Sequence, residues 1–238
     1  MRTKVKRLGG DVPPLGERPA GAAVAVWSLD TALGVVGGHS VEEALSVLDA
    51  GERDRSARFV RPDDRRRYLA SHVGLRVLLG GYLGLAPDKV ALVREECPCC
   101  GAPHGRPAVA GGGLHFSLSH SDDLAYLAFA AVPVGVDVER YPSAGAVADI
   151  LGALHPAETA ELAAAPEADR RGLLARLWAR KEACLKGTGA GLARGVAEPY
   201  VGSGPDPAEV AGWHLADLPA PAAYAAAVAV AIAVHKPT

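Results

Sequence analysis

Aromatic residues, methionine and cysteine are scarce in this sequence. Aromatics make up 5% of its 238 residues, and the chain has one methionine and four cysteines. A core must therefore be built mainly from alanine, valine and leucine. Apolar residues reach 49% and charged residues 22%, proportions that exclude an intrinsically disordered chain. The length suits one large domain or two small ones.

The chain also lacks a strong net charge and a long apolar run. Its formal charge of −2 predicts no nucleic-acid or membrane partner. The last apolar stretch, residues 222–234, is too short and alanine-rich for a membrane span and favours a buried strand. Residues 1–7 are basic, but no apolar signal core follows them, so we expect a cytoplasmic protein.

The four cysteines do not predict a disulfide framework, because cytoplasmic thiols are kept reduced. Cys97, Cys100 and His104 lie in a loop rich in Gly, Pro and Cys and have the spacing of a zinc site. A fourth ligand, such as Cys99, would be needed, and the chain has no second C-x-x-C. The favoured interpretation is reduced loop thiols, with zinc as the alternative. Cys184 is expected to be a packing residue.

Helical and strand-like patterns follow each other twice along the chain, which predicts an α+β fold. Residues 1–20 are rich in glycine and proline and are expected to form a loose leader. The N-terminal half is predicted to cover residues 21–133. The C-terminal half is predicted to cover residues 134–238, since a new pattern begins after Pro133.

A dense run of arginines precedes and enters the second predicted helix, over residues 63–83. The simple interpretation is a solvated helix face, and the alternative is a phosphate-binding patch fed by a few of them, because Arg grips phosphate oxygens in a bidentate fork. The run consists of Arg53, Arg55, Arg58, Arg61, Arg65, Arg66 and Arg67.

The segment GVDVER, residues 135–140, reads as a strand with two acids on one face. Alternation places Val136 and Val138 on one side and Asp137 and Glu139 on the other. Neighbouring carboxylates repel each other unless a cation lies between them, and such oxygen ligands suit Mg²⁺. The alternative is an edge strand with ordinary surface acids.

The segment WARKEACLKG, residues 178–187, reads as the end of a helix. Trp178, Glu182 and Lys186 are spaced i, i+4 and i+8 and share a face. Because Trp seeks the core, the acid and the lysine are carried toward the interior or into a cleft. The functional interpretation is a third metal carboxylate beside a phosphate-binding cation, and the alternative is a surface Glu–Lys pair.

The segment HFSLSHS, residues 115–121, places Ser and His side chains on a strand, where they can donate hydrogen bonds to phosphate oxygens. A nucleophilic Ser–His pair is not favoured, because adjacent strand residues point apart and no acid is placed to orient the histidine.

Together, and in this order, these segments resemble the 4′-phosphopantetheinyl transferases. The blocks are FSLSHS, GVDVE and WARKEACLKGTGAGL, with RFVRPDDRRRYLASHVGLR and GRP upstream, so the resemblance covers roughly residues 50–195. The length resembles the surfactin-synthetase-activating type. That type implies two similar α+β halves in a pseudo-twofold monomer, with one active site in the cleft between them.

The resemblance implies a role for each matching residue. Those expected to bind magnesium with the coenzyme A pyrophosphate are Asp137, Glu139 and Glu182. Those expected at the pyrophosphate or the nucleotide are Ser119, His120, Lys186, Arg106, Arg55 and Arg67. The catalytic set is expected to be Asp137, Glu139, Lys186 and Glu182, the last as a metal ligand, as the base that takes the serine proton, or as both. The chain has Glu52 where the surfactin-type relative has a lysine that contacts the nucleotide.

The implied activity is transfer of phosphopantetheine from coenzyme A to a serine of an apo acyl, peptidyl or polyketide carrier protein, with release of 3′,5′-ADP. That activity serves polyketide and nonribosomal peptide biosynthesis. One alternative is a coenzyme A- or nucleotide-binding interaction module without transferase activity, and another is a different Mg²⁺-dependent transferase acting on a nucleotide diphosphate. A binding module predicts loss of at least one carboxylate, and all three are present.

Overall fold

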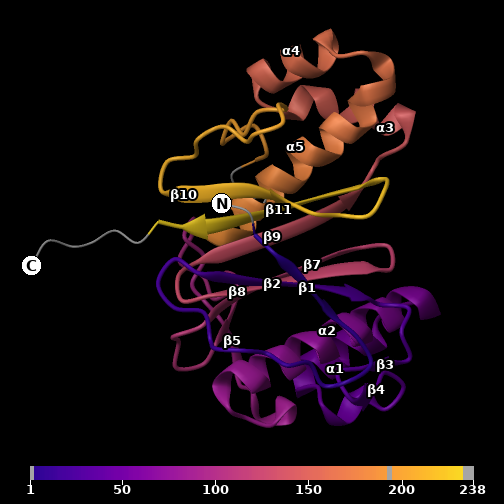
Figure 1. The fold of residues 1–238 in the computed structure, drawn as a ribbon, viewed down its shortest axis with the longest axis vertical. Helices are drawn as coiled ribbons and strands as arrows, with labels where there is room; N and C mark the ends of the chain where they lie inside the picture. The colour runs from indigo at the N-terminus through magenta and orange to yellow at the C-terminus, as the bar shows by residue number, and fades with distance from the viewer. Residues whose placement is uncertain (1–2, 192–194, 233–238) are drawn as a thin grey trace, which may run out of the picture.

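Two β-sheets lie face to face in the middle of the molecule, and helices cover the outer side of each (Figure 1). The computed structural model describes residues 3–191 and 195–232. The strands are β1 (Val5–Leu8), β2 (Val24–Asp30), β3 (Val35–Val36), β4 (His39–Ser40), β5 (Leu92–Arg94), β6 (Pro107–Val109), β7 (His115–Ser121), β8 (Leu124–Ala130), β9 (Val134–Arg140), β10 (Trp213–Leu218) and β11 (Tyr224–Ala231). The helices are α1 (Ala50–Ala57), α2 (Pro62–Leu83), α3 (Ala144–Ile150), α4 (Pro156–Ala164) and α5 (Glu167–Thr188), with 3-10 turns at Ala44–Ser46, Pro87–Lys89 and Leu151–Ala153.

The two halves repeat one plan: a strand, then helices, then a hairpin. In the first sheet the order is β1-β2-β8-β7, and in the second it is β10-β11-β9. Strand β2 runs antiparallel to β8, as β9 does to β11, so β2-β8-β7 and β9-β11-β10 correspond. This topology agrees with the α+β prediction and with two similar pseudo-twofold halves.

The space between the sheets is filled by small apolar side chains. Alternation sends Val26 and Ala128 of the first sheet, and Val136 and Val138 of the second, into this shared core. The opposite faces of the sheets pack on the helices, as Leu127 does toward α2. The aromatic-poor core expected from composition is therefore divided into three apolar layers.

Helices α2 and α5 hold equivalent places on the outer faces. Each has 22 residues, and each ends at a glycine in the left-handed region, Gly84 at φ 68° and Gly189 at φ 76°. A residue with a Cβ is strained there, so glycine sets the end of both helices. Gly189 confirms the predicted end of the last helix.

The prediction of a loose leader is wrong for residues 5–8. These residues form β1, which pairs in parallel with β2 and buries Leu8 completely. The glycines and prolines that suggested a leader come after this strand. The boundary after Pro133 stays a prediction. Residues 1–2, 192–194 and 233–238, including the end of the apolar stretch 222–234, lie outside the described residues. In the part of the chain that the structure describes, no helix has the length and apolar character to cross a membrane.

Candidate active site

A close contact between α5 and β9 brings the acids of both elements together. A Cβ on Gly135 would lie 1.9 Å from the carbonyl oxygen of Ala183 and 2.5 Å from the amide nitrogen of Gly187. Only glycine therefore lets the helix backbone rest on the strand. Alternation turns Asp137 and Glu139 toward α5, because Val136 and Val138 face the inter-sheet core.

Asp137 is the buried centre of the site, with 1% of its surface exposed. Its Oδ1 accepts hydrogen bonds from Ser119 Oγ at 2.7 Å and from Lys186 Nζ at 2.6 Å. Its Oδ2 has no partner among the described residues. Burial raises the pKa of Asp137, and the charge of Lys186 opposes this. A buried oxygen without a partner is costly, so this atom is placed to accept a further ligand.

Glu139 and Glu182 add negative charge beside Asp137. Burial and the charge of Asp137 raise the pKa of Glu139 to about 7, with Lys186 opposing and Glu182 adding to the rise. The pKa of Glu182 is raised by burial, lowered in part by Lys186 and raised again by Asp137. The charge of Asp137 thus disfavours the charged forms of both glutamates, and a cation placed among these acids would relieve this.

The three carboxylates lie near one another but do not converge on one point. Among the described residues their oxygens do not all lie within 4.8 Å of one another. Lys186 pairs with Asp137 at 2.6 Å. Three oxygen donors and the unpartnered Oδ2 of Asp137 nevertheless fit a hard divalent cation.

Strand β7 meets β9 through a row of serines. Ser117 Oγ accepts from the amide of Val136 at 3.0 Å, and Ser121 Oγ accepts from the amide of Arg140 at 3.1 Å. Ser119, between them, bonds to Asp137. The hydroxyls of Ser117 and Ser121 therefore accept hydrogen bonds from backbone amides of β9 that do not pair with another strand. Sequence reasoning selected only Ser119, although the i, i+2, i+4 spacing in FSLSHS is the signal for all three.

His120 points to the other face of β7 and is exposed. Partial removal from water lowers its pKa, and the nearby cations Lys186, His72 and Arg67 lower it further. The hydroxyl of Ser119 is bonded to Asp137 and Lys186. The structure thus agrees with the argument against a nucleophilic Ser–His pair.

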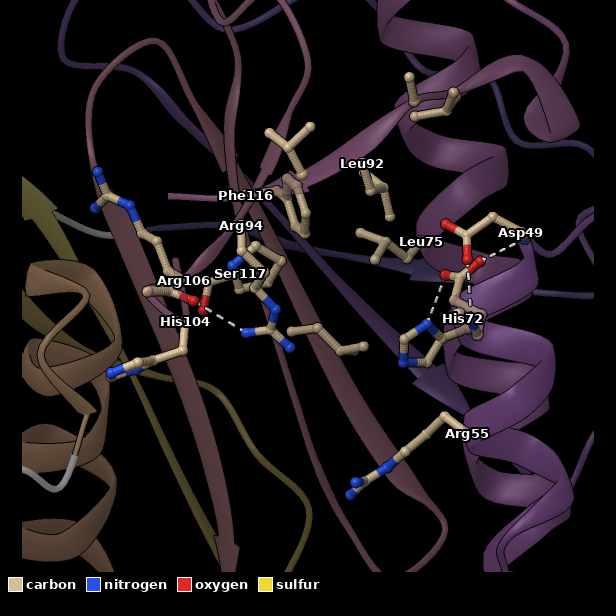
Figure 2. Close-up of a pocket in the computed structure, with 18 of the residues that line it drawn as sticks. Asp49, Arg55, His72, Leu75, Leu92, Arg94, His104, Arg106, Phe116 and Ser117 are labelled. Atoms are coloured by element: carbon tan, nitrogen blue, oxygen red, sulfur yellow. Dashed lines mark hydrogen bonds and ion pairs between the residues drawn. The ribbon is translucent and has the colours of Figure 1, made fainter. Parts of the chain in front are cut away.

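A cavity of about 1500 Å³ opens beside Lys186, and its walls come from both halves of the chain. Figure 2 shows Arg55 and His72 on one side and His104 and Arg106 on the other. Its apolar wall comes from Leu75, Leu92 and Phe116, and its other cations are Lys89, Arg94 and Lys186. Three acids lie on its wall: Asp49 and Glu52 are held by the buried Arg76, and Asp88 pairs with Lys89 at 2.8 Å. The remaining cations leave the cavity basic, so it favours an anion with an apolar part.

Arg55 and Arg106, two of the predicted nucleotide contacts, both line this cavity. The guanidinium of Arg55 lies 5.9 Å from the ring centre of Phe59. Arg106 donates from Nε to Glu95 at 2.7 Å and from Nη1 to the carbonyl of Gly187, the end of α5. Arg106 thereby joins the loop before β6 to the helix that carries Glu182.

Arg67 lies away from the cavity, and Glu52, on the cavity wall, is engaged by other protein residues. Arg67 lies outside the cavity, where it donates to Asp123 at 2.9 Å and to Asp64 at 3.1 Å. Glu52 is buried at the start of α1 and bonds to Arg76 and His72. Burial alone would raise the pKa of Glu52, but the hydrogen bonds and positive charges around it leave the pKa below its ordinary value. Glu52 therefore serves the packing of α1 on α2.

Two residues of the WARKE segment have a structural role that sequence reasoning missed. Arg180 and Lys181 are fully buried. Arg180 forms a two-point contact with Asp217, both at 2.7 Å, and Lys181 lies 2.7 Å from the buried Glu158. Lys181 also donates to the carbonyl of Pro199 at 2.8 Å. The sequence feature that could have predicted this burial is the pair of adjacent cations close to Trp178 on the same helix.

Comparisons with known proteins identify the family of the chain. The family model described as the 4′-phosphopantetheinyl transferase superfamily matches residues 133–232, and a model of the N-terminal part of 4′-phosphopantetheinyl transferases matches residues 38–132. The chain is 33% identical to the 4′-phosphopantetheinyl transferase HetI of Nostoc sp. over 160 residues, 65% of each chain.

Two further relatives carry similar names. The chain is 29% identical over 198 residues to a phosphopantetheinyl transferase of Thraustochytrium sp., covering 74% of this chain and 64% of the relative. It is 25% identical over 153 residues to the 4′-phosphopantetheinyl transferase Sfp of Bacillus subtilis, covering 63% and 64%. The match spans less than two thirds of the length of these three relatives. The two family models together match residues 38–232, and the chain belongs to the 4′-phosphopantetheinyl transferase superfamily.

Proposed function

We propose that this protein transfers the 4′-phosphopantetheine group from coenzyme A to a serine of an apo acyl, peptidyl or polyketide carrier protein. The observation that supports this most is that one residue, Lys186, connects the basic cavity to the acid cluster. Lys186 lines the cavity and also bonds to Asp137 at 2.6 Å. A ligand with an anionic nucleotide and a pyrophosphate would thus reach from Arg55 and Arg106 to the carboxylates.

Coenzyme A would lie in the cavity with its pyrophosphate at Lys186. Arg55 and Arg106 would face its nucleotide end, and Lys186 and His120 would hold pyrophosphate oxygens by charge-assisted hydrogen bonds, with Ser119 beside them. Asp137, Glu139 and Glu182 would hold Mg²⁺, which when bound supplies charge neutralisation at the pyrophosphate.

In the transfer step, the oxygen of the carrier serine forms a bond to the β-phosphorus of coenzyme A. The bond between that phosphorus and the bridging oxygen breaks, and 3′,5′-ADP leaves with the electron pair. The serine proton passes to Glu182, directly or through a water. A base at this position is worth about 10²–10⁴ in rate, and its raised pKa suits the task. The remaining residues act by positioning and charge.

We further propose that the protein acts as a cytoplasmic monomer. Both halves contribute to one cavity, so a second copy is not needed to complete the site. Size-exclusion chromatography with light scattering would check the oligomeric state.

The experiment is to incubate the purified chain with coenzyme A, Mg²⁺ and an apo carrier protein, and to weigh the carrier by intact mass spectrometry. We expect the carrier to gain one phosphopantetheine group and 3′,5′-ADP to appear. A carrier whose acceptor serine is replaced by alanine, and a reaction with a chelator, serve as controls. Tight coenzyme A binding without any mass gain would instead support a coenzyme A-binding module.

A further inference from the structure

The loop between β5 and β6 brings two cysteines and a histidine together at the cavity wall. The ligand atoms of Cys97, Cys100 and His104 all lie within 4.8 Å of one another, and Cys100 Sγ is 3.1 Å from His104 Nε2. All four cysteines of the chain are free thiols. Cys99, beside this cluster in sequence, does not belong to it.

The loop backbone is folded as a tight turn around the Cys97 sulfur. The amide of Gly101 donates to the carbonyl of Cys97, and the amide of Cys97 donates to the carbonyl of Ala102, both at 2.8 Å. Gly101 has φ +73°, a conformation that favours glycine. This turn holds both sulfurs of the C-x-x-C on one side.

The separations suit a tetrahedral ion. With Zn–S near 2.3 Å and Zn–N near 2.0–2.1 Å, ligand atoms around zinc lie about 3.3–3.8 Å apart. The Cys100–His104 separation of 3.1 Å is close to this range, and all three ligand atoms lie within 4.8 Å of one another. Two thiols and one imidazole are ligands that zinc prefers. A hydrogen bond between thiol and imidazole explains why Cys100 lies beside His104. It does not explain why the Cys97 sulfur also lies within 4.8 Å of both.

We propose that Cys97, Cys100 and His104 bind one zinc ion, with water in the fourth position. Cys97 is buried, whereas Cys100 and His104 are exposed, so solvent and metal reach the site from outside. The proposal goes beyond the transferase function and does not depend on it. It takes up the alternative interpretation of this loop, because the structure brings the three ligand atoms within 4.8 Å of one another.

The site would brace the hairpin that presents Arg106. The amide of Gly105 donates to the carbonyl of Glu95 at 2.8 Å, and the amide of Glu95 donates to the carbonyl of Arg106 at 3.1 Å. A Cβ on Gly105 would lie 2.6 Å from the Glu95 carbonyl oxygen, so the two arms are in close contact. Cys97, His104 and Arg106 line the same cavity. Zinc would thus fix one wall of the cavity without touching the carboxylates.

The test uses the full chain without an affinity tag, loaded with zinc, dialysed, and analysed by plasma mass spectrometry. We expect about one zinc per chain. Cobalt loading should give the intense visible absorption of a tetrahedral thiolate site. Cys100→Ser and His104→Ala change exposed residues, so circular dichroism should show an intact fold while zinc is lost. Removing zinc from the wild type should lower its melting temperature.

Two matched controls locate the ion. Cys99→Ser should keep zinc, because Cys99 lies outside the cluster, and Asp137→Asn should keep it, because the carboxylates are a separate site. A wild-type chain without stoichiometric zinc after loading would overturn the proposal. Equal zinc in a folded Cys100→Ser chain would do the same, and loss of zinc in Cys99→Ser would contradict the three-ligand set. Metal content is measured without coenzyme A or carrier, so this result is independent of transferase activity.

Discussion

Strand β2 with helix α2, and strand β9 with helix α5, have the same lengths but carry different chemistry. Aligned end to end, Trp27 and Leu29 take the places of Asp137 and Glu139. Trp27 and Leu29 pack against α2 in an apolar core. The fold therefore accepts apolar residues at these positions, and the C-terminal half has carboxylates there for a reason other than packing.

Both halves also contain a buried ion pair at equivalent places. Glu52 pairs with Arg76 at 2.5 Å, and Glu158 pairs with Lys181 at 2.7 Å. Each glutamate is the third residue of its helix and completes a capping box. These pairs belong to the repeated plan, whereas the acid cluster belongs to one half. Shared features therefore indicate structural roles, and features of a single half indicate functional ones.

The largest expected effect on stability comes from breaking the C-terminal ion pair. Glu158→Gln leaves Lys181 buried without a counter-charge, which costs about 3–5 kcal/mol. Glu52→Gln should cost less, because Arg76 keeps Asp49 at 2.7 Å and the carbonyl of Val90 at 3.0 Å. Urea denaturation of both variants checks this, and equal losses would contradict it.

Gly135→Ala should separate α5 from β9. The added methyl group would lie 1.9 Å from the Ala183 carbonyl oxygen, so the helix must shift at a cost of about 1–3 kcal/mol. Ala25 holds the equivalent place on β2, so Ala25→Gly is the matched control and should have a smaller effect. Thermal melts and transfer assays report the two consequences, and a fully active and stable Gly135→Ala chain would rule out the close contact.

The sequence alone predicts features that depend on neighbouring residues, and it misses features that depend on contacts between distant residues. Alternation along residues 134–140 correctly places Asp137 opposite the valines, because a strand's period is local. The resemblance selected Arg67 as well as Arg106, but only tertiary contact shows that Arg67 is held by Asp123 on another hairpin. Strand β1 was missed because its partner is distant in sequence. The turn at Cys97 likewise depends on contacts that spacing does not fix.

Lys186→Ala should weaken coenzyme A binding by about 10-fold or more, because a charged hydrogen bond is worth about 1.5–3 kcal/mol. Its counterpart on α2 is Gly81, so the N-terminal half has no equivalent cation. His120→Ala should have a smaller effect in the same direction. Calorimetry measures both, and unchanged affinity in the two variants would remove them from the phosphate site.

The smallest expected effect is a pH dependence from Glu139. Its pKa is about 7 in the folded chain and near 4.5 when unperturbed. The folded state therefore holds the proton more tightly, and stability falls as pH rises from about 4.5 to 7, by about 1 kcal/mol. Glu139→Gln in the presence of a chelator should remove this loss, with little change at pH 5 and a gain at pH 8. If the melting temperatures of wild type and variant changed equally with pH over this range, Glu139 would not be the source of the pH dependence.

The most direct test of the central claim is the rate of carrier modification by Asp137→Asn and Glu182→Gln, with folding followed by circular dichroism. The control is Glu167→Gln, an exposed acid on the same helix as Glu182. We predict that both site variants stay folded and lose at least about 100-fold in rate, while the control matches the wild type. Near-normal transfer by a folded Asp137→Asn chain would contradict the assignment of the carboxylate cluster as the catalytic centre.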